Sequence, residues 1–215
     1  MDIAIIGAGN VGRALATSFA RAGHSVIIAS RDPEDAGAVA SATRARVATS
    51  NAEAAAAAGV VVLAIPFAGA EIVAAEIREG VAGKVVVDVT NRMGFGATGP
   101  TIDAGESNAE RLAAWLPEAH VVKAFNTLFA SHQADPIADG VQLDGFVAAD
   151  DAGAKATILE LVRSMGLNPV DVGPLGRAQQ LEQLAFLNIA LNITGNGAWQ
   201  SGWKLVAAPP LPAAA

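Results

Sequence analysis

Three glycines near the start of the chain have the spacing of a phosphate-binding turn. Gly7, Gly9 and Gly12 form the pattern Gly-x-Gly-x-x-Gly directly after a short apolar run, and Asn10 and Val11 stand where a helix would begin. Such glycines let the backbone turn tightly and approach a pyrophosphate, which the free N–H groups of the helix start then bind. Because a strand precedes the pattern and a helix follows it, the pattern predicts a dinucleotide site. The alternative is a glycine turn without a ligand.

The second expected strand, residues 25–29, ends in Ser30 and Arg31. At this place a protein that binds NAD carries an acidic residue, which accepts hydrogen bonds from the ribose. A hydroxyl and a guanidinium instead match a 2′-phosphate in charge and geometry. The pair therefore predicts a preference for NADP(H), the alternative being a solvated surface pair. We interpret Asp32 as a turn or helix-cap residue.

Later strand ends should line the rest of the cofactor path, because a ligand in an open α/β sheet lies outside the carboxyl ends of the strands. The predicted lining residues from three such ends are Ile65, Pro66, Asn91, Ala124, Asn126 and Thr127. The side chains of Asn126 and Thr127 can bond a carboxamide. The sequence thus predicts that the nicotinamide end of the dinucleotide lies at these strands.

Two titratable residues fall in the same strands. Lys123 is the one candidate general acid, with a structural ion pair as the alternative interpretation. Asp88 is either catalytic or a structural carboxylate that caps nearby amides. No side chain is therefore assigned as a catalytic residue. Hydride transfer between two rings needs only that the reacting carbons be held about 3–3.5 Å apart and aligned.

Strands and helices alternate along the chain. The expected strands are 1–6, 25–29, 46–48, 60–65, 84–89, 119–124, 145–149 and 169–172. The expected helices are 10–22, 33–43, a short one from 51, 68–78, 108–116, 151–165 and 178–194. This alternation predicts an α/β protein with a Rossmann-type, doubly wound, mostly parallel sheet. We divide the chain into a nucleotide-binding domain, residues 1–172, and a small C-terminal helical segment, residues 173–215.

Composition excludes several classes of protein. The chain has 215 residues, of which 52% are hydrophobic and 16% charged, and a net charge of −7. An acidic chain is a poor partner for nucleic acid, so none is expected. The absence of cysteine excludes disulfides, thiolate nucleophiles and cysteine metal sites, and the three histidines show no ligand spacing, so no metal is expected. The longest apolar stretch is too short to span a bilayer, and we expect a cytoplasmic protein without a membrane segment.

Several motifs together resemble those of two related groups of oxidoreductases. They are the glycine pattern with Asn10, the pair Ser30-Arg31, VDVTN (87–91), SNAE (107–110), VVKAFNT (121–127) and DVGPL (171–175). These segments resemble NADPH:coenzyme F420 oxidoreductases and the cytosolic oxidoreductase domain of the STEAP metalloreductases. The resemblance covers roughly residues 1–193.

The resemblance implies an activity and a set of partners. It implies hydride transfer between NADP(H) and coenzyme F420 or a flavin, in a protein that is often a homodimer. It places Gly9 to Val11, Ser30 and Arg31 on the phosphates and Asn126 and Thr127 at the nicotinamide. One departure is the acidic pair Glu34-Asp35, where some members have a basic residue.

The C-terminal segment is expected to contribute to the acceptor pocket. The candidate apolar walls are Met93, Phe95, Leu128, Trp199 and Trp203, each of which could instead be core. Coenzyme F420 has an acidic tail, which Arg92 and Arg177 could bind at the rim, unless both are ordinary surface arginines.

Two other functions stay open. The chain could be an NADP-dependent dehydrogenase or imine reductase for a small substrate, although only 43 residues follow Val172 to build the helical domain that such enzymes close over the substrate. It could also be an NADPH-binding protein without catalysis.

Overall fold

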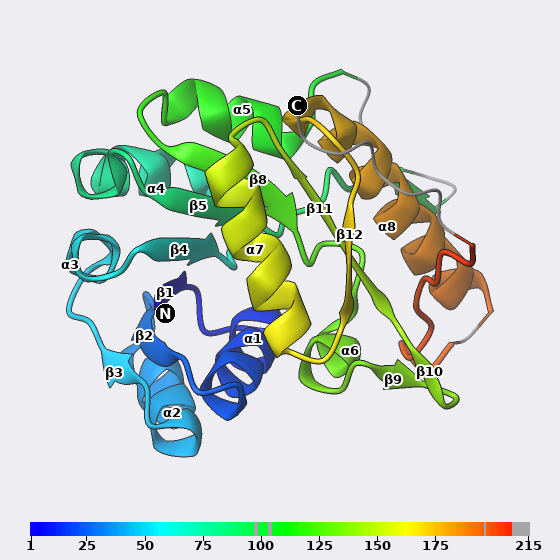
Figure 1. The fold of residues 1–215 in the computed structure, drawn as a ribbon, viewed down its shortest axis with the longest axis horizontal. Coiled ribbons are helices and arrows are strands. Elements are labelled where there is room, and N and C mark those ends of the chain that lie inside the picture. Colours follow the sequence, from blue (N-terminus) through cyan, green and yellow to red (C-terminus); the bar gives the residue numbers. More distant parts are fainter. Residues whose placement is uncertain (97–98, 103–104, 196, 208–215) are drawn as a thin grey trace.

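The computed structural model describes residues 1–96, 99–102, 105–195 and 197–207. Its centre is an eight-stranded sheet in the order β12-β11-β8-β5-β4-β1-β2-β3 (Figure 1). The strands of this sheet are β1 (Asp2–Ile6), β2 (Ser25–Ala29), β3 (Arg46–Val47), β4 (Val60–Leu63), β5 (Val85–Asp88), β8 (His120–Ala124), β11 (Asp144–Ala149) and β12 (Asn168–Asp171).

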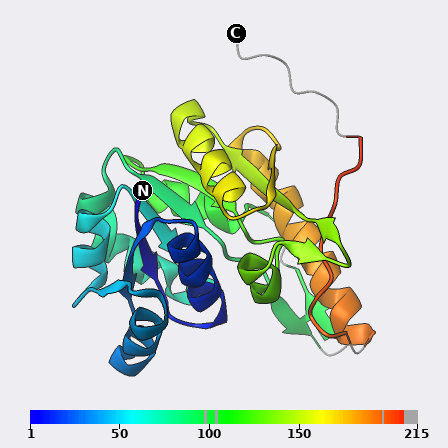
Figure 2. The same cartoon turned by 60° about the horizontal axis from the view of Figure 1, so that its bottom comes forward.

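Helices cover both faces of the sheet. The α-helices are α1 (Asn10–Arg21), α2 (Pro33–Thr43), α3 (Asn51–Ala57), α4 (Ala70–Ile77), α5 (Asn108–Trp115), α6 (Ala130–Ala134), α7 (Ala152–Ser164) and α8 (Ala178–Thr194). Short 3₁₀ turns are η1 (Phe67–Gly69), η2 (Arg78–Val81) and η3 (Leu175–Arg177). Figures 1 and 2 show α8 at the β12 end of the sheet, far from β3.

Side chains of the central strands alternate between two apolar cores. On β1, Ile3 and Ile5 join the core under α1, α2 and α7, whereas Ala4 and Ile6 join the core under α3, α4 and α5. A strand buried on both faces reads as a continuous apolar run, which is why the runs in β1, β4 and β5 predict a doubly covered sheet. The predicted fold class is confirmed.

The last two strands reverse direction. β1, β2, β3, β4, β5 and β8 run parallel, but β11 pairs antiparallel with β8, and β12 pairs parallel with β11. The connection from β8 to β11 holds only the short helix α6 and the hairpin of β9 (Ile137–Ala138) and β10 (Val141–Gln142). Because that connection does not cross the sheet and return, β11 starts at the edge where β8 ends.

Between the expected strand 84–89 and the expected helix 108–116, the sequence is rich in glycine, threonine and proline and predicts a loop at 94–105. The structure has a second small hairpin there. It consists of β6 (Gly94–Gly96) and β7 (Gly99–Thr101), which pair antiparallel. Glycine and proline dominate these strands, so the sequence carries no alternating pattern that would predict them. The expectation of a pure loop was wrong for these residues.

Helix α8 buries polar side chains and exposes apolar ones. Glu182, Asn188 and Asn192 are buried, whereas Leu187 and Leu191 are exposed. Residues 197–207 run back along this helix, where the Ser201 hydroxyl accepts from Asn192 at 2.7 Å. The last eight residues of the expected C-terminal segment, 208–215, lie outside the described residues. Within the described part of the chain, no helix has the length and hydropathy that a bilayer crossing requires.

Candidate functional site: a dinucleotide groove at the sheet edge

The glycine pattern forms a tight turn between β1 and α1. Gly7 has a φ of +112°, and a Cβ on it would lie 2.2 Å from the Ala64 carbonyl oxygen. A Cβ on Gly12 would lie 1.9 Å from the Gly7 oxygen. Both positions therefore require glycine, because a side chain at Gly7 would clash with the residue after β4 and a side chain at Gly12 would clash with the turn itself. A Cβ on Gly9, in contrast, would meet no described atom within 4 Å.

The open space at Gly9 lies directly at the start of α1. Gly9 is exposed and caps this helix without a side-chain hydrogen bond, and Asn10 is also exposed. The first N–H groups of an α-helix have no intrahelical acceptor, and they carry the positive end of the helix dipole. This geometry suits the close approach of a pyrophosphate that the sequence predicts.

Ser30 and Arg31 stand at the end of β2, next to β1. The Ser30 hydroxyl oxygen accepts from the Asp32 N–H at 3.2 Å, so its hydrogen is free to donate outward. Arg31 is exposed and forms no ion pair with the described residues. Asp32 caps α2 by accepting from the Glu34 N–H at 2.9 Å, which confirms its interpretation as a cap residue.

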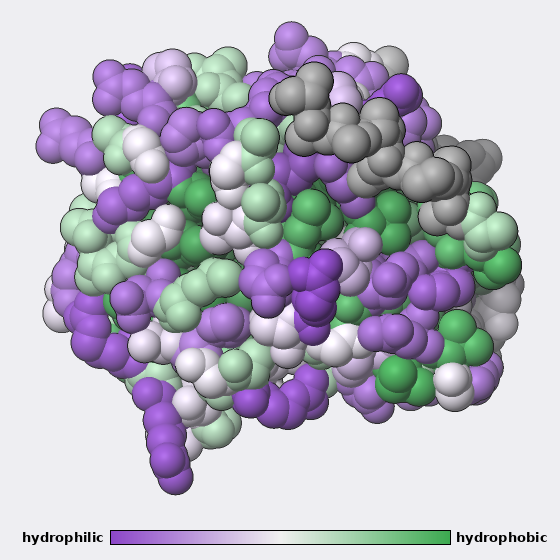
Figure 3. Space-filling view, viewed as in Figure 1, coloured by the Kyte–Doolittle hydropathy of each residue, from purple (hydrophilic) through white to green (hydrophobic). Residues whose placement is uncertain are grey.

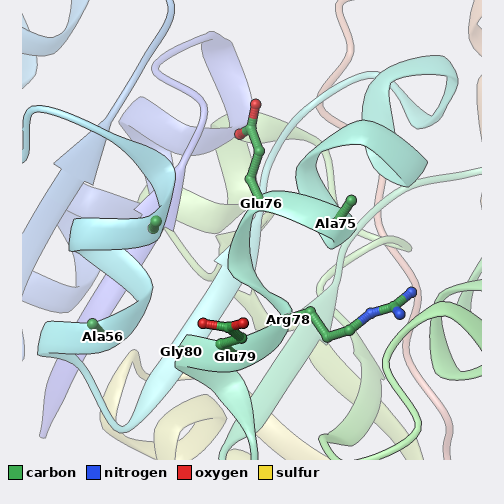
Figure 4. A pocket seen from close by; sticks show the side chains of 7 residues that line it. Ala56, Ala75, Glu76, Arg78, Glu79 and Gly80 are labelled. Atoms are coloured by element: carbon green, nitrogen blue, oxygen red, sulfur yellow. The ribbon is translucent and has the colours of Figure 1, made fainter.

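A hollow of about 360 Å³ lies beside this pair. Its lining residues are Ala29, Ser30, Arg31, Ala48, Ser50, Asn51, Ala52 and Glu76. The hollow places a cationic and a hydroxyl donor together at a concave surface, as a phosphorylated ribose requires. A larger hollow of about 550 Å³ adjoins it between α3, α4 and η2 (Figure 4). That second hollow contains none of the predicted site residues, and Figure 4 shows the Glu76 side chain pointing away from Glu79.

Two asparagines join the ends of β5 and β8. The Asn126 Nδ2 donates to the Asn91 Oδ1 at 2.8 Å, and the Asn91 Nδ2 donates to the Asn126 carbonyl oxygen at 3.2 Å. Phe125 lies in the turn between the end of β8 and Asn126, and its φ of +63° is in the left-handed region. Thr127 follows and is buried. The structure thus brings Asn91, Asn126 and Thr127 together, as the order of the strands predicts.

One atom of this pair lacks a partner. The Asn126 Oδ1 is buried and accepts no hydrogen bond from any described residue. An unsatisfied buried acceptor is costly, by about 1–3 kcal/mol, and points to a ligand or an ordered water. The amide N–H of a nicotinamide carboxamide is a donor of the right kind. The residues at this strand edge therefore fit the nicotinamide end of the predicted cofactor.

The other predicted lining residues also lie at this edge. Ile65 and Pro66 follow β4, with Ile65 half-buried and Pro66 exposed, and Ala124 ends β8 in the core. The backbone of the glycine turn contacts the same segment, because Gly7 lies against Ala64 and Ile65.

Four charged side chains form a buried cluster behind the asparagines. This charge cluster consists of Asp88, Arg92, Lys123 and Glu182, whose side chains are at most 5% exposed. Lys123 Nζ donates to Asp88 Oδ2 at 2.7 Å and to Glu182 Oε1 at 2.8 Å. Arg92 Nε donates to Glu182 Oε2 at 2.6 Å. Two positive and two negative groups make the cluster neutral, so each buried charge is compensated.

The contacts decide between the alternatives for Lys123 and Asp88. The third donor bond of Lys123 goes to the Thr90 carbonyl oxygen at 2.5 Å, so its ammonium has no hydrogen left for a substrate. Asp88 accepts from Lys123 and, at 2.9 Å, from the Thr90 N–H. In the structure Lys123 is thus an ion-pair partner, and Asp88 makes the contacts expected of a structural carboxylate.

Arg92 is not the rim residue that the sequence suggests. Its side chain is buried, and beyond Glu182 it donates to the Gly105 carbonyl oxygen at 2.6 Å. Arg177, the other arginine considered for this role, is exposed at the start of α8. The expectation for Arg92 was wrong because the sequence did not reveal Glu182, a carboxylate from α8 that is distant in the chain.

Of the candidate apolar walls, Leu128 belongs to the core under α1 and α7, and Trp203 packs against β11, β12 and α8. Trp199 is exposed and lies edge-on to Phe129, with the ring centroids 5.2 Å apart. Met93 is half-buried, and the side chain of Phe95 lies outside what the structure describes. No cluster of metal-ligating side chains occurs among the residues with a described position.

The chain matches known proteins over most of its length. The family model described as "NADP oxidoreductase coenzyme F420-dependent" matches residues 2–92. An F420-dependent NADP reductase from Methanothermobacter thermautotrophicus is 37% identical over 209 residues, which are 90% of this chain and 90% of that protein. The metalloreductase STEAP3 from Rattus norvegicus is 34% identical over 85% of this chain, but the chain spans only 36% of its length.

Solved structures support the same relationship to F420-dependent NADP reductases. A crystal structure assigned as an F420-dependent NADP reductase from Arthrobacter sp. FB24 matches with a TM-score of 0.87 and 32% identity, over 96% of this chain and 99% of that one. A reductive aminase from Aspergillus terreus matches with a TM-score of 0.67 at 19% identity, which shows a shared fold. The resemblance read from the motifs is confirmed: the chain belongs to the F420-dependent NADP reductase family.

Proposed function

We propose that this protein transfers a hydride between NADP(H) and coenzyme F420. The observation that carries the proposal is one continuous strand edge. It joins an open helix start at Gly9, a donor pair at Ser30 and Arg31, and a buried free acceptor at Asn126. Across the sheet from β2 through β1 to β8, these groups follow the order of the dinucleotide: 2′-phosphate, pyrophosphate and carboxamide. The names of the relatives support F420 as the second substrate.

Each part of this strand edge would hold the cofactor by a different interaction. The N–H groups of α1 bind the pyrophosphate, and Arg31 pairs with the 2′-phosphate while Ser30 donates to it. Asn126 accepts from the carboxamide and thereby fixes the rotation of the nicotinamide ring. Bound NADPH supplies a hydride, and the acceptor completes its reduction with a proton from water. The protein's contribution is the alignment of the two rings, since the nearby lysine is fully paired and has no proton to offer.

The C-terminal segment, residues 173–215, belongs to the proposed acceptor site. Helix α8 reaches the strand edge through Glu182, which lies against Lys123 and Arg92. This placement supports our division of the chain into a cofactor-binding part, residues 1–172, and an acceptor-side part, residues 173–215. A flavin is the second acceptor that we propose, and the protein would act as a homodimer in the cytoplasm.

The test is a panel of acceptors. NADPH oxidation is followed under anaerobic conditions with coenzyme F420, FMN, FAD, riboflavin, a small ketone and a small imine in turn. We expect turnover with F420, and weaker turnover with one of the flavins. Turnover with the ketone or the imine alone would replace the proposal with the small-substrate reductase, and NADPH binding without any turnover would indicate a non-catalytic protein.

A further inference from the structure

We propose that Lys123 and Glu182 are positioning residues for the nicotinamide. Acting through Thr90 and Asn91, they hold the Asn126 side-chain amide so that its Oδ1 faces the cofactor rather than another protein group. The inference rests on the proposed function, because it concerns the nicotinamide end of the same groove. Neither residue touches the cofactor in this account.

Thr90 is fixed at three points by the residues around it. Its N–H donates to Asp88 Oδ1 at 2.9 Å, and its carbonyl oxygen accepts from Lys123 Nζ at 2.5 Å. Its hydroxyl oxygen accepts from Asn108 Nδ2 at 2.9 Å. A residue outside any helix or strand normally has more freedom than this. Two of these three bonds come from charged side chains, which form the stronger class of hydrogen bond.

The fixed residue determines the position of the asparagine pair. Asn91 follows Thr90 directly, and it exchanges two hydrogen bonds with Asn126. Because the Asn91 Oδ1 accepts from the Asn126 Nδ2, the amide of Asn126 can have only one orientation. In that orientation its Oδ1 is the buried acceptor without a partner. A shift of Thr90 would release Asn91, and the Asn126 amide could then rotate.

Glu182 completes the arrangement from the side of α8. Its Oε1 accepts from Lys123 Nζ and from the Asn108 N–H, both at 2.8 Å. Lys123 and Asn108 are two of the three groups that hold Thr90. Glu182 therefore determines where both of those donors stand, and its other oxygen is occupied by Arg92.

The energetic balance favours a role in positioning over a role in stability. Burying four charges is a poor source of stability, since replacing such a cluster by apolar side chains is often neutral or stabilising. What a fully bonded polar cluster does supply is one fixed geometry. In this chain the cluster fixes the position of Thr90, the residue directly before Asn91 of the asparagine pair.

The experiment separates positioning from stability by restoring neutrality. Lys123→Met leaves the cluster with one net negative charge, and Glu182→Gln leaves it with one net positive charge. The double variant K123M/E182Q is neutral again but lacks both positioning groups. Lys84→Met is the control, because Lys84 directly precedes β5 at the sheet edge opposite the asparagines and donates to the Ala55 and Ala56 carbonyl oxygens, both at 2.9 Å.

Three quantities are measured for each variant: the melting temperature, the Kd of NADPH and the Kd of 2′,5′-ADP, which lacks the nicotinamide. A fourth measurement is the hydride-transfer rate in a single turnover with F420. We expect the single variants to raise the Kd of NADPH and lower the transfer rate by about tenfold each, the scale of one hydrogen bond. The Kd of 2′,5′-ADP should stay within about twofold.

The double variant carries the decisive comparison. We expect it to recover melting temperature relative to Lys123→Met while keeping the weakened NADPH binding and the slow transfer. Recovery of NADPH binding together with melting temperature would overturn the inference, as would an equal loss of 2′,5′-ADP binding in the single variants. If Lys123→Met does not fold, Glu182→Gln is compared with the control Lys84→Met in the same way. A parent protein that binds neither NADPH nor 2′,5′-ADP would refute the proposed function itself.

Discussion

Arg31 and Asn126 stand at opposite ends of the proposed cofactor, and each offers a hydrogen-bonding group that the described residues leave unused. Arg31 is a cation at the surface, and Asn126 offers a buried neutral oxygen. Salt and water screen the first interaction but not the second. Arg31 should therefore determine which dinucleotide binds, and Asn126 should determine how the reacting ring is oriented.

The first prediction concerns the choice between NADP(H) and NAD(H). Arg31→Ala should raise the Kd of NADPH about ten- to hundredfold, the value of one charge-assisted hydrogen bond of roughly 1.5–3 kcal/mol. The exposure of Arg31 favours the lower end of that range. The Kd of NADH should hardly change. Calorimetric titration of both cofactors measures this, and equal affinities for NADPH and NADH in the parent protein would contradict the assignment of the pair.

The second prediction concerns the buried carboxylate of Asp88. Asp88→Asn should lower the hydride-transfer rate by less than about a hundredfold, because loss of a true general acid or base costs at least that much. The substitution keeps an oxygen that can accept from the Thr90 N–H. Single-turnover kinetics give the rate, and circular dichroism checks the fold. A ten-thousandfold loss in a folded variant would show that proton transfer runs through this carboxyl.

Helix α5 shows how a local sequence signal defines an element. Ser107 caps it by accepting from the Glu110 N–H, and the Glu110 carboxylate accepts from the Ser107 N–H at 2.8 Å, which is a capping box. Burial raises the pKa of the Glu110 carboxyl. The hydrogen bonds from Ser107 and Gln179 outweigh this effect and hold that pKa below its ordinary value of 4.5.

The third prediction follows from the direction of that shift. A carboxyl whose pKa is lower in the folded state stabilises the protein above its unfolded-state pKa, and this contribution disappears as the pH falls through the folded-state value. Glu110→Gln should therefore lower the free energy of unfolding at neutral pH by about 0.5–1 kcal/mol, the scale of a helix cap. The difference from the parent should shrink below pH 4.5. Urea unfolding at several pH values measures it; a difference that grows with acid would refute the assignment.

Local patterns predicted the elements well, and contacts between distant elements were missed. The glycine turn, the cap at Asp32 and the strand ends at Asn91 and Asn126 all follow from a few neighbouring residues. The pairing of Glu182 with Lys123 depends on how two segments 59 residues apart meet. The reversal of β11 depends on how β11 pairs with β8. Glu182, the only charged residue of α8, was the one available signal for the charge cluster, and its partner could not be named without the fold.

At the scale of the whole molecule, apolar surface gathers at the β12 end. Leu187, Leu191 and Ile193 of α8 are 49%, 56% and 42% exposed, and Ile137 and Val141 of the β9–β10 hairpin are also exposed. Figure 3 shows hydrophobic residues at the lower right, where Figure 1 places that hairpin. An exposed apolar helix face of this kind is typical of an interaction surface.

The fourth prediction tests the proposed homodimer at this surface. The double variant Leu187→Glu/Leu191→Glu should shift the protein from dimer to monomer, because two charges would have to be buried in the interface. Light scattering coupled to size-exclusion chromatography gives the mass. The exposed Ile72 on α4 lies outside this surface, so Ile72→Glu serves as the control and should leave the mass unchanged. A parent protein that is monomeric at all concentrations would contradict the proposed homodimer.

The most direct test of the central claim follows the hydride itself. NADPH labelled with deuterium at either face of nicotinamide C4 is incubated with the protein and coenzyme F420, and the reduced F420 is analysed by mass spectrometry. An aligned pair of rings in the groove predicts that one labelled face delivers its deuterium to F420 and the other delivers none. Reduced F420 without deuterium from either label, or with deuterium from both, would contradict direct transfer in a fixed geometry at this strand edge.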